Sequence, residues 1–116
     1  MPRKFIKSFK YARAGAKHAL RTQRNLWIHF FIGLAVLGVA IWFKVSLIEL
    51  AILLVAIFGV IVAEMVNTSL EELVNILSPG HREEAALAKN VAAAAVLLAA
   101  AGAVVVGCLI FIPRLI

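Results

Sequence analysis

The chain has 116 residues, 64% of them hydrophobic, and it carries a formal net charge of +6 at pH 7. An apolar fraction so far above the roughly 45–50% of soluble domains excludes an ordinary water-soluble protein, and the length allows one domain. The single cysteine, Cys108, excludes an internal disulfide and a cysteine metal site. We therefore expect residues 1–116 to form one integral membrane domain.

The first segment, residues 3–24, has the pattern of an amphipathic helix. Its cations recur at spacings of three and four, while aromatic and small apolar residues mark a different face. Such a helix can lie in the head-group layer, with Lys7, Lys10 and Lys17 at the membrane surface, or it can pack on neighbouring spans. Beside apolar spans, a basic run favours anionic lipid and a cytoplasmic location, and we expect no nucleic-acid partner.

The second segment, residues 26–43, is predicted to be the first membrane span. Its length is near the lower limit for crossing a hydrocarbon core of roughly 30 Å. Trp27 and Trp42 lie near its ends, where indole rings prefer the interface. His29 lies just inside the cytoplasmic end, and we interpret it as a hydrogen-bond partner of a neighbouring residue rather than as a ligand.

Two further apolar segments, residues 47–77 and 91–112, complete the predicted spans. The first of them would be about 45 Å long at 1.5 Å per residue, so one end must protrude from the membrane. Glu49 is expected to be interfacial and solvated, and residues 81–89 are expected to form a cytoplasmic hairpin. The predicted fold class is an all-α membrane protein, with three transmembrane helices and an N-terminal interfacial helix.

Four polar residues share one face of the predicted 47–77 helix. Glu64, Asn67, Glu71 and Asn75 are spaced by three, four and four residues, which brings them to one side at 3.6 residues per turn. The run before them carries no charge, and polar side chains at the end of such a run are costly unless they have partners or a function. This face is therefore the candidate functional site.

The residue types on this face suit a site for a metal ion and phosphate. Mg²⁺ commonly uses one or two carboxylates together with substrate phosphates, and Glu71 fits that role. Lys89 could offset phosphate charge, and Asn67 and Asn90 could orient oxygens. Glu64 is better placed to accept a proton from a lipid hydroxyl. A purely structural polar network between helices accounts for the spacing equally well.

The stretch from Glu64 to Glu71 reads E-M-V-N-T-S-L-E, which matches the pattern E-x-x-N-[ST]-[AS]-[IL]-E. It is followed by His81 and by Lys89 in the sequence A-K-N. On these residues, the basic leader and the three spans, the chain resembles the small prokaryotic diacylglycerol kinase family, which includes the undecaprenol kinases. The resemblance covers almost the whole chain.

The resemblance implies a lipid kinase that transfers the ATP γ-phosphate to the hydroxyl of undecaprenol or diacylglycerol, with Mg²⁺. It also implies a homotrimer in the bacterial cytoplasmic (inner) membrane, with sites between subunits and with the N-terminus and active site on the cytoplasmic side. By position, it makes Glu64 the catalytic base, Glu71 and Gln23 metal ligands, and Asn67, Lys89 and Asn90 contacts of the nucleotide phosphates.

Three amides stand where the family usually has acids. Gln23 and Asn90 replace a glutamate and an aspartate, and Asn75 replaces an aspartate. Each exchange keeps the side-chain shape but removes a negative charge, and an amide binds a divalent cation less well than a carboxylate does. The alternative hypothesis is therefore a catalytically weakened relative, or a non-enzymatic membrane assembly or binding protein of the same fold.

Overall fold

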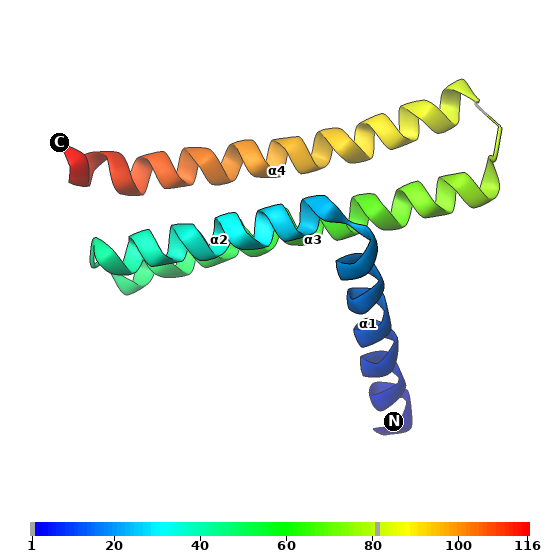
Figure 1. The fold of residues 1–116 in the computed structure, drawn as a ribbon, viewed down its shortest axis with the longest axis horizontal. Helices are drawn as coiled ribbons and strands as arrows, with labels where there is room; N and C mark the ends of the chain where they lie inside the picture. The colour runs from blue at the N-terminus through cyan, green and yellow to red at the C-terminus, as the bar shows by residue number, and fades with distance from the viewer. Residues whose placement is uncertain (1, 81) are drawn as a thin grey trace.

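A computed structural model of the protein describes residues 2–80 and 82–116, which form four helices and no strand. The helices are α1 (Pro2–Thr22), α2 (Arg24–Trp42), α3 (Leu47–Leu77) and α4 (Glu83–Leu115). In Figure 1, α2, α3 and α4 run alongside one another, whereas α1 turns away steeply from the others. The all-helical prediction is confirmed.

Three of the four helices, α2, α3 and α4, are long and apolar enough to cross a membrane. This confirms the predicted three spans. Because α3 has 31 residues and α4 has 33, both exceed the length that a hydrocarbon core requires. Figure 1 shows the two helices extending together past the point where α1 departs, so their surplus lies at the α3–α4 turn.

The junction of α1 and α2 is a sharp turn at a single residue. Gln23 has extended backbone angles, φ −113° and ψ 103°, and it separates the two helices close to the predicted boundary between residues 3–24 and 26–43. The indole Nε1 of Trp27 donates a hydrogen bond of 2.6 Å to the carbonyl of Leu20, across the turn. Leu26 and Ala19 are buried there. These contacts fix the direction in which α1 leaves the bundle.

The opposite end of the bundle is held by Glu49, which the sequence suggested would be solvated. Its carboxylate completes a capping box with Ser46 at the start of α3. It also accepts hydrogen bonds of 2.8 and 2.6 Å from the Nη1 and Nη2 atoms of Arg114 near the end of α4. Glu49 is therefore a paired residue, because the antiparallel course of α4 returns Arg114 to the beginning of α3.

The connection between α3 and α4 is shorter than the predicted hairpin of residues 81–89. Helix α4 already begins at Glu83, so most of that polar stretch forms its first two turns. Glu83 and Glu84 in the first turn complement the positive end of the helix dipole. His81, part of the family pattern, lies outside the described residues. Residues 83–89 are thus part of helix α4 and do not form a separate hairpin.

Helix α2 approaches α3 closely at Gly33, which is buried. A Cβ atom at Gly33 would lie 2.8 Å from Ile57 Cγ2, so either the Ile57 side chain or one of the two helices would have to shift. We expect Gly33→Ala to lower the free energy of unfolding by about 1–3 kcal/mol, as overpacking does, in detergent unfolding followed by circular dichroism. Gly38→Ala is the matched control, because a Cβ there meets nothing within 4 Å. Equal stability of Gly33→Ala and the unsubstituted protein would contradict the close approach.

Candidate functional site

The polar face of α3 begins with a buried carboxylate. Glu64 is only 4% exposed, and its Oε2 atom lies 3.7 Å from Nε2 of His29 on α2. One turn further on, the Thr68 hydroxyl donates a hydrogen bond of 3.0 Å to the Glu64 carbonyl. The side chain of Glu64 therefore faces the helix bundle and not the lipid.

Asn67 and Glu71 continue this face toward the α3–α4 turn. The Asn67 Nδ2 atom donates a hydrogen bond of 3.4 Å to Glu71 Oε1. Asn67 is buried, and its Oδ1 atom has no hydrogen-bond partner among the described residues. A buried acceptor without a partner is costly and points to a further group that binds there. Glu71 itself is half-buried.

These oxygens fit a Mg²⁺ ion that also contacts phosphate. The ion prefers oxygen ligands and commonly takes one or two from the protein, with the rest from phosphates and water. The Glu71 carboxylate is an oxygen donor of this kind, and the neighbouring Asn67 Oδ1 atom is an acceptor without a partner among the described residues. Within residues 2–80 and 82–116, no group of three acidic, histidine or cysteine side chains could hold a metal without help. The donor set therefore suits an ion that arrives with its phosphate.

A polar pocket of about 400 Å³ opens where α3 and α4 meet their connection. Lys89 on α4 donates a hydrogen bond from Nζ to Asn75 Oδ1 on α3, and Asn90 lies beside it on the pocket wall. Arg82 adds a second cation to the lining. The lining carries two cations and two amides against one carboxylate, Glu83, so its net positive charge can bind an anionic group such as phosphate. The structure thus brings together Asn75, Lys89 and Asn90.

Gln23, predicted as a metal ligand, lies at the α1–α2 turn instead of on this face. Its side chain is half-buried and makes no capping hydrogen bond within residues 2–80 and 82–116. In the part of the chain that the structure describes, no hydrogen bond or ion pair joins Gln23 to Glu71. Its role as a ligand remains a prediction.

Helix α1 is tied to the same end of α3 by a contact that the sequence did not reveal. His18 Nε2 lies 2.6 Å from Oε1 of Glu72, the residue next to Glu71. The predicted surface residues of α1, Lys7, Lys10 and Lys17, are all exposed. Because His18 and Glu72 are far apart in the chain, their pairing could not be predicted from sequence spacing and is seen only in the folded structure.

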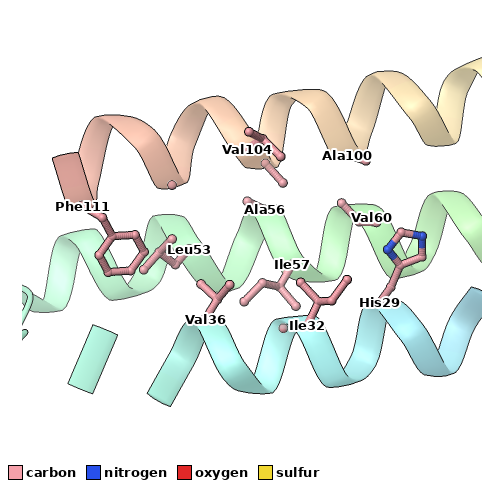
Figure 2. Close-up of a pocket in the computed structure, with 13 residues that line it drawn as sticks. His29, Ile32, Val36, Leu53, Ala56, Ile57, Val60, Ala100, Val104 and Phe111 are labelled. Carbon is pink, nitrogen blue, oxygen red and sulfur yellow. The ribbon is translucent and has the colours of Figure 1, made fainter. Parts of the chain in front are cut away.

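An apolar groove of about 300 Å³ runs between α2, α3 and α4. Figure 2 shows Phe111 at one end and His29 at the other, with aliphatic side chains such as Leu53 and Ile57 between them. His29 is the one polar residue in the lining among the described residues. The groove therefore ends beside the histidine that faces Glu64.

Comparison with known proteins gives consistent matches over most of the chain. The family model described as prokaryotic diacylglycerol kinase matches residues 10–111. The diacylglycerol kinase of Synechocystis sp. is 42% identical over 110 residues, 94% of this chain and 63% of that protein. The undecaprenol kinase of Bacillus subtilis is 36% identical over 112 residues, 97% of this chain and 91% of that protein. This chain thus spans somewhat less than two thirds of the Synechocystis relative's length. With three spans and the polar face of α3 in place, the chain belongs to the prokaryotic diacylglycerol kinase family.

Proposed function

We propose that this protein is an ATP- and Mg²⁺-dependent lipid kinase that phosphorylates the hydroxyl of undecaprenol or diacylglycerol. The observation that carries the proposal is the face of α3, where a buried Glu64 is followed by Asn67 and the half-buried Glu71. The face runs from the apolar bundle toward the polar α3–α4 turn. A membrane-held alcohol and a soluble nucleotide can meet at such a boundary.

The reaction needs alignment and charge neutralisation more than covalent chemistry from the protein. The acceptor hydroxyl oxygen forms a bond to the γ-phosphorus, the bond to the β–γ bridging oxygen breaks, and ADP leaves. Glu64 takes the hydroxyl proton. Glu71 and Gln23 would hold Mg²⁺, and the bound ion would neutralise phosphate charge. Asn67, Lys89 and Asn90 contact the nucleotide phosphates.

The surface next to Glu64 supports a lipid as the phosphate acceptor. A groove lined by hydrocarbon side chains ends at His29, the residue that faces this carboxylate. Such a surface suits a substrate with a long apolar chain better than a soluble alcohol. The names of the two relatives, diacylglycerol kinase and undecaprenol kinase, support the same substrate class.

The protein works as a homotrimer in the bacterial inner membrane, with the N-terminus and the active site on the cytoplasmic side. The basic residues of α1 support this orientation, because cytoplasmic flanks carry the excess of lysine and arginine. The free Asn67 Oδ1 atom supports a site completed by a further group, from substrate or from a second subunit.

A non-enzymatic membrane assembly protein of the same fold is the second candidate. The amides at Gln23, Asn75 and Asn90 favour it, because they remove negative charge from positions near the proposed metal and phosphates. In that case the polar face would serve helix association only. Substitutions on the face would then change oligomer stability, and no lipid would be phosphorylated.

The deciding experiment incubates purified protein in mixed micelles with labelled ATP and Mg²⁺. Diacylglycerol and undecaprenol are supplied in separate reactions, and label is followed into extracted lipid. We expect transfer to one of the two acceptors, which would also identify the substrate. No transfer to either, from protein shown to be folded and oligomeric, would favour the assembly protein.

A further inference from the structure

His29 is half-buried on α2, and its ring is directed toward α3 (Figure 2). Its Nε2 atom lies 3.7 Å from Oε2 of Glu64, whose side chain is 5% exposed. The other two ion pairs of the described residues, His18 with Glu72 and Arg114 with Glu49, involve more exposed carboxylates. The contact of His29 is therefore the one made to a buried acid.

A buried carboxylate requires a partner, because an isolated charge away from water is strongly destabilised. Over residues 2–80 and 82–116, the Glu64 carboxylate makes no hydrogen bond to another side chain, and His29 is its one ion-pair partner. The 3.7 Å separation is longer than a hydrogen bond. Such contacts are often long without substrate and shorten in the reacting complex.

We propose that His29 is a positioning residue for the phosphoryl transfer. In the reacting complex, where this contact shortens, donation from its Nε2–H group to Oε2 holds the Glu64 carboxylate at the end of the apolar groove. The second carboxylate oxygen is then free to receive the proton of the acceptor hydroxyl. This inference rests on the proposed kinase function and adds to it a residue that acts through Glu64.

A kinetic cycle tests whether His29 acts through Glu64. We expect His29→Leu, which keeps the volume but removes the donor, to lower kcat on the order of 10–100-fold, as for outer partners that orient working side chains. The KM for ATP should stay unchanged. His29→Gln retains a donor and should recover most of the lost kcat. In the Glu64→Gln background, His29→Leu should have little further effect.

The contact itself is tested without kinase activity, by NMR of the protein with labelled histidine side chains in micelles. We expect Glu64→Gln to shift the ring-nitrogen resonances of His29 and to leave those of His18 unchanged. Glu72→Gln is the matched control, since it should shift His18 and leave His29 unchanged. These resonances can be measured even if the protein has no kinase activity, and the measurement does not require the His29→Leu variant to fold.

Three results would overturn the inference. Unshifted His29 resonances in Glu64→Gln would show that the two residues do not interact. An unchanged kcat in His29→Leu would show that the interaction does not matter for transfer. An equal loss of kcat from His29→Leu in the presence and absence of Glu64 would show that His29 acts on its own. A protein without kinase activity but with the shifted resonances would refute the proposed function, and with it the role of His29 in transfer, while the contact between His29 and Glu64 would stand.

Discussion

Glu71→Gln is expected to lower the rate of lipid phosphorylation by roughly 100-fold to 1,000-fold, the scale of losing one preorganised electrostatic group. The carboxylate is half-buried beside Asn67 and is the acid nearest the α3–α4 turn on the candidate face. An amide in its place is a weaker ligand for a divalent cation. The rate should recover in part when the Mg²⁺ concentration is raised in the micelle assay.

The substitution should leave the fold intact, since the remaining amide oxygen can still accept the hydrogen bond from Asn67 Nδ2. Glu72→Gln, one residue further along α3, is the matched control. It removes the same charge, and the one side-chain contact that it alters among the described residues is that with His18, so its phosphorylation rate should stay near that of the unsubstituted protein. If Glu71→Gln phosphorylates lipid at the full rate, Glu71 has no part in holding the metal.

The hydropathy of the sequence was sufficient to predict the three membrane spans, because the lipid surroundings restrict which backbone conformations are stable. A helix in lipid satisfies its own backbone hydrogen bonds, so a long, continuous apolar run is expected to cross the membrane as a helix. The ends of the helices were less predictable. The break at Gln23 depends on contacts such as Trp27 with Leu20, and the early start of α4 at Glu83 continues the helix into polar sequence.

The face of α3 was predictable because it depends on local spacing alone. Residues three and four apart on a helix must share a side, and the structure places Glu64, Asn67 and Glu71 as the spacing requires. The partners on other helices were not predictable. His29, for example, lies next to Glu64 because α2 packs against α3. No local sequence pattern shows how the two helices align along each other.

Glu64→Gln is expected to slow turnover by roughly 100-fold to 10,000-fold, the range for removing a general base. The amide cannot accept the proton of the acceptor hydroxyl, although it keeps the shape of the buried side chain. Since Glu64 lies among the apolar residues of the bundle, the loss should fall on kcat. The kcat is measured in mixed micelles at saturating ATP and lipid.

Binding of ATP separates this effect from damage to the nucleotide site. The proposed phosphate contacts, Lys89 and Asn90, line a pocket at the α3–α4 turn, whereas Glu64 lies further into the bundle. The dissociation constant for ATP, measured with a fluorescent analogue and Mg²⁺, should therefore be the same with and without the substitution. Lys89→Gln is the complementary variant, and it should weaken ATP binding.

Unchanged turnover in Glu64→Gln would remove this residue as the base. A loss of ATP binding in the same variant would mean that burial of the carboxylate supports the fold of the site, and that its chemistry lies elsewhere.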